Sequence, residues 1–360
     1  MAIYDINGNE ISAGGELTTA DVKKGVIAAI ASGDVNMGSA VGATLSYTSP
    51  GTAWETNAVT AYNNLLNAYR EIPNIGVPFM IYTDQHNSGV EPMRWLNNHD
   101  ADINGMGVMN LNLGDTCDAD FNETVLSKLY DRTWQIKNYI GVLGNHDAIN
   151  GNYYDLNRWF ISTRGRKFYN GAMPCFTVED NAHTVKYIAV GNYILGTDSN
   201  YSKGLTTDAA KWLIDELSAN DGYDIVYLQH WGMYKSRRAR NEETETTVDT
   251  ARENANTSSN NYKMWQLLLA RKNKESGTFE DADGVVHNFD FTDCEHELLI
   301  TLHGHDHAEL FSTVDGLTAY AADRCVNSRC TFGLIDRQNS KVTFWVFDKN
   351  GCLDPLELPI

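Results

Sequence analysis

Long apolar runs and paired cysteines are both missing from this 360-residue sequence. Its longest apolar stretch, residues 25–31, is far shorter than a helix that crosses a bilayer, so no membrane span is expected. The six cysteines include no Cys-x-x-Cys pair, which argues against a disulfide framework or a cysteine zinc site. We therefore expect buried or idle thiols, although Cys325 and Cys330 could face each other across a turn.

Basic residues are also scarce: 28 Lys and Arg oppose 47 Asp and Glu, for a formal net charge of −19. Such a charge repels long polyanions, so nucleic-acid scaffolding is disfavoured, while small or short substrates remain open. Bound divalent cations would offset part of the charge. The first residues lack the basic and apolar regions of a secretory signal, so a cytoplasmic location is the default expectation. The oligomeric state stays open.

The remaining pattern predicts an α/β domain over residues 51–360. Residues 1–50 are interpreted as an appendage or arm, with an N-terminal strand and helix packed on the domain as an equal alternative. A polar stretch, 236–262, predicts a long loop or lid, and Asp283-Gly284 predicts a hairpin over 277–291. Periodicity predicts helices over 53–70, 121–138 and 206–218, and strands over 77–83, 108–113, 140–143, 185–190, 193–196, 225–229, 298–302, 317–321, 330–335 and 342–347.

Histidines and carboxylates gather where five of these strands end. The segments are Asp84-Gln85-His86, Gly114-Asp115-Thr116-Cys117-Asp118, Gly144-Asn145-His146-Asp147, the single His230, and His303-Gly304-His305-Asp306-His307. Ligands in open α/β sheets bind at the carboxyl ends of strands. Residues two apart in an extended segment point the same way, so Asp84 with His86, and His305 with His307, can each converge on one cation.

The spacing adds to this argument. Asp84 and Asp115 are 31 positions apart, and Asp115 and Asn145 are 30 apart. Each interval matches one βαβ unit, so the three segments are expected on successive strands at one end of a sheet. Each segment alone could be an ordinary turn or strand cap. Together they predict a metal site.

In this order the segments read DxH, GDxxD, GNHD, H and GHxH, which resembles the calcineurin-like metallophosphoesterase superfamily over about residues 75–350. The resemblance implies an α/β fold, α+β in some schemes: a four-layer αββα sandwich of two mixed sheets flanked by helices. The GDxxD segment has no tyrosine, which argues against a purple Fe(III)-tyrosinate enzyme.

The resemblance also implies a role for each residue. One metal would be held by Asp84, His86 and His307, the other by Asn145, His230 and His305, with Asp115 bridging them. His146 would lie beside the metals without ligating either, and Asp118 would orient it. The mixed nitrogen and oxygen ligands suit Mn, Fe or Zn rather than Ca.

The function expected is dinuclear-metal phosphoesterase activity on phosphomonoesters or phosphodiesters, in which a metal-bound hydroxide attacks phosphorus. The alternative is a binding or structural protein in which the metals only hold loops together, and a phage particle or cell surface is a further possible location. Arg237 and Arg238 could clamp a substrate phosphate, whereas a solvated loop that balances the nearby glutamates is the favoured interpretation.

Overall fold

The computed structural model describes residues 52–73, 75–86, 105–116, 138–144, 146, 167–168, 175–191, 205–234, 236–247, 258–325 and 328–360, with Pro92, Trp95, His99 and Ile103. All of them belong to a unit that spans residues 40–360. The predicted appendage, strand 193–196 and nearly all of helix 121–138 lie outside the described residues. Within the described part of the chain, no helix combines the length and apolar character needed to cross a bilayer.

One sheet has seven strands and mixed directions. Its parallel part is formed by β1, β2 and β3, and β15 and β16 extend it antiparallel beyond β1. Their bounds are β1 Gly76–Tyr82, β2 Met109–Asn112, β3 Tyr139–Gly141, β15 Cys330–Asp336, β16 Lys341–Asp348, β17 Gly351–Cys352 and β18 Leu356–Pro359. Every residue of β1, β2 and β3 is buried, as expected of parallel strands covered on both faces.

The other sheet has nine strands in the order β4-β5-β6-β7-β12-β14-β13-β8-β9. Strands β6, β7, β12 and β14 run parallel, while β5, β13 and β8 are antiparallel to their neighbours. The bounds are β4 Lys167–Phe168, β5 Cys175–Asp180, β6 Val185–Val190, β7 Asp224–Gln229, β8 Ser236–Ala239, β9 Thr246–Thr247, β12 Leu298–His303, β13 Leu310–Ser312 and β14 Ala319–Ala321.

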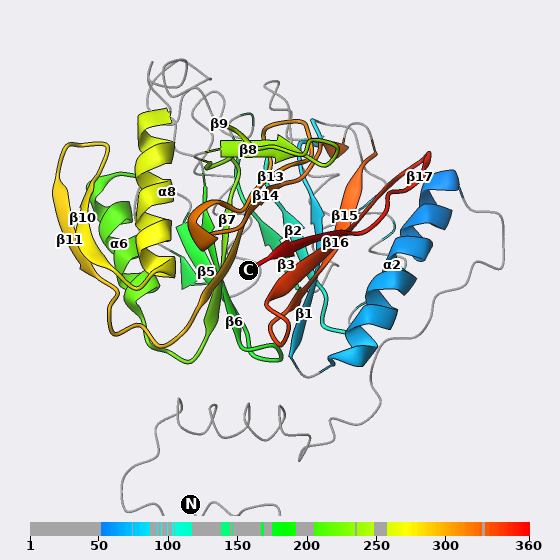
Figure 1. Ribbon diagram of the computed structural model, residues 1–360, viewed down its shortest axis with the longest axis horizontal. Coiled ribbons are helices and arrows are strands. Elements are labelled where there is room, and N and C mark those ends of the chain that lie inside the picture. Colours follow the sequence, from blue (N-terminus) through cyan, green and yellow to red (C-terminus); the bar gives the residue numbers. More distant parts are fainter. Residues whose placement is uncertain are drawn as a thin grey trace, which may run out of the picture. The chain divides into compact units, whose positions relative to one another are not determined.

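Three apolar clusters stack these elements into four layers. The middle cluster joins the two sheets, since it contains side chains of β1, β2 and β16 together with β6, β7 and β12. Helix α2 (Ala53–Glu71) packs on the outer face of the first sheet. Helices α6 (Thr207–Ser218) and α8 (Ser258–Lys272) cover the second (Figure 1). The predicted sandwich of two mixed sheets flanked by helices is confirmed.

The first helix illustrates why these residues form these elements. Thr52 and Glu55 form a capping box, in which each side chain bonds the backbone N–H of the other. The buried residues of α2 recur at helical spacing, for example Ala58, Tyr62, Leu65 and Tyr69, so one face packs on the sheet. The helix predicted over 53–70 is therefore confirmed.

In the polar stretch 236–262, predicted as a long loop or lid, the described residues 236–247 and 258–262 contain strands and the start of a helix, while residues 248–257 lie outside the described part. Residues 236–239 form β8, which pairs with β13, and β9 pairs with β8. Glu245 fixes this segment by accepting hydrogen bonds from Ser236, Ser312 and Thr313. Helix α8 then begins at Ser258. The composition hides these elements, because β8 is only partly buried and is held by side-chain hydrogen bonds more than by an apolar core.

The hairpin predicted over 277–291 is confirmed as β10 (Ser276–Glu280) and β11 (Val286–Asp290). Asp281 stabilises its turn by accepting hydrogen bonds from the backbone N–H groups of Asp283 and Val285 and from His287 Nε2.

One arginine links the two sheets. Arg337, in the turn after β15, donates to the carbonyl of Ile75, the carboxylate of Asp224 and the carbonyl of His183. Asp224 begins β7, and His183 lies in the turn between β5 and β6 of the second sheet. The guanidinium therefore connects the two sheets where β1 and β7 begin.

Candidate metal centre

The candidate ligands lie just after the carboxyl ends of parallel strands from both sheets. Asp84 and His86 follow β1, Asp115 follows β2, and His146 follows β3 in the first sheet. In the second sheet, His230 follows β7, and His305 and His307 follow β12. Backbone hydrogen bonds join these loops: Asp84 N–H donates to Gly114 O, and Gly304 N–H donates to His230 O.

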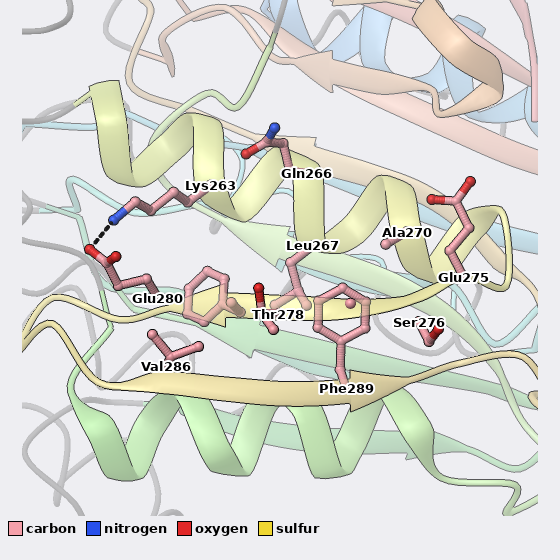
Figure 2. A pocket seen from close by; sticks show the side chains of 12 residues that line it. Lys263, Gln266, Leu267, Ala270, Glu275, Ser276, Thr278, Glu280, Val286 and Phe289 are labelled. Atoms are coloured by element: carbon pink, nitrogen blue, oxygen red, sulfur yellow. Dashed lines mark hydrogen bonds and ion pairs between the residues drawn. The ribbon is translucent and has the colours of Figure 1, made fainter.

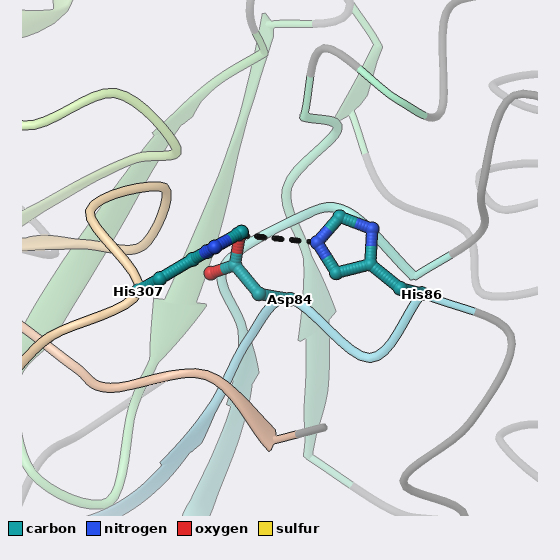
Figure 3. A group of neighbouring side chains, drawn as sticks. All are labelled: Asp84, His86 and His307. Carbon is teal, nitrogen blue, oxygen red and sulfur yellow. Dashed lines mark hydrogen bonds and ion pairs between the residues drawn. The ribbon is translucent and has the colours of Figure 1, made fainter. Parts of the chain in front are cut away.

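One donor group consists of Asp84, His86 and His307, whose ligating atoms all lie within 4.8 Å of one another. The two imidazole Nε2 atoms are 3.2 Å apart, and His307 Nε2 is 3.1 Å from Asp84 Oδ1. Figure 3 shows both rings and the carboxylate directed toward a common point. Two imidazoles and one carboxylate form a donor set suited to a transition metal.

A second donor group consists of Asp115, His230 and His305, again within 4.8 Å of one another. His230 Nδ1 donates to the carbonyl of Leu113 at 2.6 Å, which directs Nε2 toward Asp115 Oδ2 at 3.1 Å. A histidine whose other ring nitrogen is bound to a backbone carbonyl has a fixed tautomer and orientation, as metal-ligating histidines commonly have.

Asp115 also belongs to a third group, with His86 and His146. Its Oδ2 lies 3.9 Å from His146 Nε2, and its Oδ1 accepts the backbone N–H of His146. His86 likewise belongs to two groups, so the three groups overlap and form one cluster around Asp115.

Three donor atoms of the cluster are buried without a hydrogen bond. Asp84 Oδ1, Asp115 Oδ2 and His230 Nε2 lack a well-aligned partner among the described residues, despite approaches as short as 3.1 Å. Leaving buried polar atoms unsatisfied costs about 1–3 kcal/mol each. A cation coordinated by these atoms would remove that cost, so the residues present fit a metal.

Five of the candidate ligands have unusual backbone conformations. Asp84, His86, Asp115, His305 and His307 have φ values of 52°, 44°, 51°, 68° and 53°. Left-handed conformations are uncommon in residues other than glycine and cost about 1–3 kcal/mol each. The fold holds these five side chains in place against that cost, which is typical of a functional site.

Two glycines let these loops approach closely. A Cβ at Gly144 would lie 2.1 Å from Asp115 Oδ1, and one at Gly304 would lie 2.0 Å from Thr83 Oγ1. Thr83 Oγ1 in turn donates to Asp84 Oδ2 at 2.8 Å. Any larger residue at either position would displace a carboxylate of the cluster.

The charges of Asp115 and His230 stabilise each other. Burial raises the pKa of Asp115, but the His230 imidazole outweighs burial and lowers this pKa to about 2. Burial lowers the pKa of His230, whereas Asp115 and Asp84 raise it to about 10. Before a metal binds, His230 is therefore protonated beside an ionised Asp115. A cation that takes both as ligands would displace this proton, so its binding would weaken as pH falls.

The pKa values of the remaining donors shift in different directions. Burial, together with the charge of His230, lowers the pKa of His305 to about 3, so its ring is neutral, the form that ligates metals. The close contact with Asp84 raises the pKa of His307. Burial raises the pKa of Asp84, but the contacts with His307 and His230 lower it below its usual value.

Of the residues expected at the site, Asn145 and Asp118 lie outside the described residues. Arg237 lies close to the cluster, because its Nη1 is 2.7 Å from Oδ1 of Asp306, which stands between His305 and His307. Arg238 instead lies 4.8 Å over the Phe311 ring and donates to the carbonyls of Glu242 and Glu243.

Sequence reasoning did not assign two neighbours of the cluster. The indole of Trp231 stacks on His305, with ring centroids 3.7 Å apart and planes 27° apart. Asp306 accepts hydrogen bonds from Tyr234 and Arg237, which fixes the loop that carries His305 and His307. Both neighbours adjoin a predicted ligand in sequence, the only signal that could have indicated them.

Other histidines have partners elsewhere. His183 is buried between Asp180 and Tyr69, and His287 binds Asp281. His303 is buried in β12 within hydrogen-bond distance of Thr301, and burial lowers its pKa to about 3. None of the three belongs to a donor group found among the described residues.

A separate hollow of about 380 Å³ lies between α8 and the β10–β11 hairpin (Figure 2). Leu267, Phe279 and Phe289 line its base, and an ion pair between Lys263 and Glu280 lies at one end. It shares no residue with the candidate metal centre.

No family model matches this chain, and a search of curated proteins finds no relative. Similar solved structures include GAP50, described as the anchor in the inner membrane complex of Plasmodium (12% identity, 79% of this chain and 89% of that chain, TM-score 0.47). A Streptococcus pneumoniae protein described as a predicted phosphoesterase is 10% identical over 79% of this chain and 98% of that chain, with a TM-score of 0.35. Phosphopantetheinyl hydrolase from Mycobacterium tuberculosis is 12% identical over 70% of this chain and 91% of that chain, with a TM-score of 0.34.

Proposed function

We propose that this protein is a phosphoesterase that uses two divalent metal ions to hydrolyse small or short phosphomonoesters or phosphodiesters. The observation that carries the proposal is the cluster around Asp115. Two carboxylates and five imidazoles from both sheets converge there, and three of their donor atoms are buried without a hydrogen bond. One group of three donors would support a single metal site, whereas two such groups joined by a third support a pair of ions.

In this proposal Asp84, His86 and His307 would hold one ion, Asn145, His230 and His305 would hold the other, and Asp115 would contribute to both. Mn, Fe and Zn suit these ligands. When bound, such ions lower the pKa of water and neutralise charge on phosphoryl oxygens. The fold contributes the orientation of the ligands: His230 Nδ1 is bound to the Leu113 carbonyl, and Thr83 Oγ1 donates to the Asp84 carboxylate.

His146 is proposed as the group that donates a proton to the departing alkoxide. Its side chain is 36% exposed, so it can reach a substrate, while its ring packs edge-on against His86 at 4.7 Å. Asp118 would orient it. The backbone N–H of His146 remains bound to Asp115, which keeps this residue beside the ligands.

The net charge of −19 favours a small or short substrate over a long polyanion. Arg237 and Arg238 are the proposed contacts for substrate phosphate. Arg237 is the better placed of the two, because Asp306 holds it next to the loop of His305 and His307.

The proposal is tested by measuring metal content and screening phosphoesters. The purified full chain is assayed with Mn, Zn or Fe added, against p-nitrophenyl phosphate and bis-(p-nitrophenyl) phosphate. Hydrolysis that requires metal is expected, and the preferred ester separates a monoesterase from a diesterase. Stoichiometric metal without turnover of any ester in a broad panel would contradict the proposal and favour a protein in which metals only hold loops together.

A further inference from the structure

We propose that Cys325 and Cys330 form a reversible disulfide whose closure weakens metal binding at Asp84. The disulfide concerns a part of the molecule outside the donor groups. Its effect on metal binding rests on the function proposed above.

The sulfur atoms of Cys325 and Cys330 are 3.7 Å apart, and both residues are buried, with exposed fractions of 0% and 2%. Both residues belong to the apolar cluster beneath α2. A turn brings them together, since Ser328 N–H donates to the carbonyl of Cys325. Sulfurs in contact need to approach by only about 1.7 Å to reach a disulfide bond of about 2.05 Å.

The pair lies at the end of β1, next to a proposed ligand. Cys325 N–H donates to the carbonyl of Thr83 at 2.8 Å. Cys330 begins β15, whose next residue, Thr331, pairs with Ile81 of β1. Thr83 Oγ1 donates to Asp84 Oδ2, so the backbone that carries Cys325 is two hydrogen bonds from the carboxylate of Asp84.

Drawing the sulfurs together therefore moves backbone that supports Asp84. Cys330 belongs to β15, which pairs with β1 and β16, whereas Cys325 lies outside the strands, so Cys325 is the residue expected to move. A shift of Cys325 loosens its hydrogen bond to Thr83, and the Asp84 carboxylate loses part of its orientation. Outer partners that orient metal ligands typically contribute about 10–100-fold in affinity.

Hydrogen peroxide is the oxidant class proposed, because it is small enough to enter a buried site. One thiol is oxidised to a sulfenic acid with release of water, and the other thiol attacks that sulfur and expels a second water. Overall, two thiols and one peroxide give one disulfide and two waters. A dithiol reductant reverses the reaction by thiol–disulfide exchange.

Trypsin provides a direct test, because it cleaves after Arg324, Arg329 and Arg337. The full chain is treated with hydrogen peroxide, remaining thiols are alkylated, and the digest is examined by mass spectrometry. Peptides 325–329 and 330–337 are expected as one linked species that separates on reduction. Mn²⁺ titration of reduced and oxidised protein is expected to show about tenfold weaker binding after oxidation.

The Cys325→Ala and Cys330→Ala variants should form no linked species and keep their Mn²⁺ affinity after peroxide. Cys352→Ala, which alters an exposed cysteine, should respond like the wild type. Two alkylated peptides from oxidised wild type, or a linked species with unchanged Mn²⁺ affinity, would overturn the inference. Both measurements are independent of ester hydrolysis, so a protein that cleaves no phosphoester could still pass this test.

Discussion

Among individual residues, Asp115 is the carboxylate that belongs to two of the three donor groups. It is 1% exposed, and one of its oxygens is buried without a hydrogen bond. A single change at this carboxylate therefore affects both proposed ions.

Asp115→Asn is expected to lower metal content and phosphoesterase activity together, because an amide loses the negative charge shared by the ions. Replacing even a partner of a ligand costs about 10–100-fold in affinity, so this change should cost more. Metal analysis of the purified variant and the ester assay measure both effects. Asp293→Asn, at an exposed position, serves as control, and retention of two metals by Asp115→Asn would contradict the bridging role.

His146→Ala is expected to reduce turnover by about 10²–10⁴-fold while leaving both metals bound, because the residue is proposed to transfer a proton and not to ligate. Steady-state kinetics and metal analysis separate the two roles. Since His146 also lies within a donor group, loss of one metal from the variant would identify it as a ligand instead. His296→Gln provides a comparison outside these groups.

At this scale the sequence was informative because ligands must follow strand ends, and strand ends are visible as apolar runs that stop at Asp, Asn or His. It could not indicate that Trp231 stacks on His305 or that Asp306 binds Arg237. Those contacts depend on how the loops after β7 and β12 approach each other, which no local pattern encodes. Asn145 and Asp118 remain predictions.

The loops that follow the strands depend on close approach between elements. At Gly144, after β3, even a methyl group would lie 2.1 Å from Asp115 Oδ1. Gly144→Ala is therefore expected to displace Asp115 and to lower metal affinity and activity in the same direction as Asp115→Asn. Gly284→Ala is a matched control, because a Cβ there meets nothing within 4 Å, although its φ of 80° costs stability. Unchanged metal affinity in Gly144→Ala would argue against this packing.

The β10–β11 hairpin gives a pH-dependent prediction. Burial raises the pKa of Asp281, but hydrogen bonds from His287 and two backbone N–H groups lower it below the usual value of about 3.9. A carboxyl group whose pKa is lower in the folded than in the unfolded state stabilises the fold at pH values above its unfolded-state pKa. This contribution is lost as the pH falls through the folded-state pKa. Asp281→Asn should thus lower the free energy of unfolding by about 1–2 kcal/mol at pH 7 and by less in acid, measured by denaturant unfolding.

If Asp281→Asn lowered the free energy of unfolding equally at pH 7 and in acid, the carboxylate charge would not be what stabilises the turn. Asp293→Asn again serves as the exposed comparison.

Most elements with an apolar period were predictable to within two residues, for example α2, β6 and β7. The stretch around β8 and β9 was not, because its residues are polar and its order comes from Glu245 and from pairing with the distant β13. Helix α8 begins at Ser258, inside the polar stretch 236–262. Its buried apolar residues, such as Trp265 and Leu268, come after that stretch, so the polar composition of its first turn concealed where it begins.

For the whole molecule, Arg337 is the clearest link between the sheets. Its guanidinium contacts Ile75, Asp224 and His183, with the Asp224 carboxylate at 3.1 Å. Arg337→Gln is expected to lower the free energy of unfolding by about 2 kcal/mol, because a partly buried carboxylate and two carbonyls lose their donor. Denaturant unfolding measures this.

Metal content of the folded Arg337→Gln protein should be unchanged. Arg337 contacts Ile75 and Asp224, where β1 and β7 begin, whereas the candidate ligands follow the ends of these strands. Lys349→Gln, at an exposed position, is the matched control. A loss of metal with no loss of stability would contradict this division of roles.

The layered architecture was predictable from the alternation of strands and helices together with the family-like motif order. The strand order was not. Local pattern predicts that β1, β2 and β3 are neighbours, but it contains no information that β15 pairs with β1 across most of the chain. Such pairing is set by burial of both faces of each sheet in the assembled sandwich.

That pairing has a consequence for how the protein is made. Gly76 of β1 pairs with Asp336 of β15, 260 positions later. At about 5–20 residues per second, a ribosome needs roughly 13–52 s to supply the partner. Throughout that interval the emerging chain carries an apolar strand with one open edge and an incomplete ligand cluster, because His305 and His307 are also translated late. The open edge of β1 therefore persists until β15 is made near the end of translation, and shielding by a chaperone would matter most before that point.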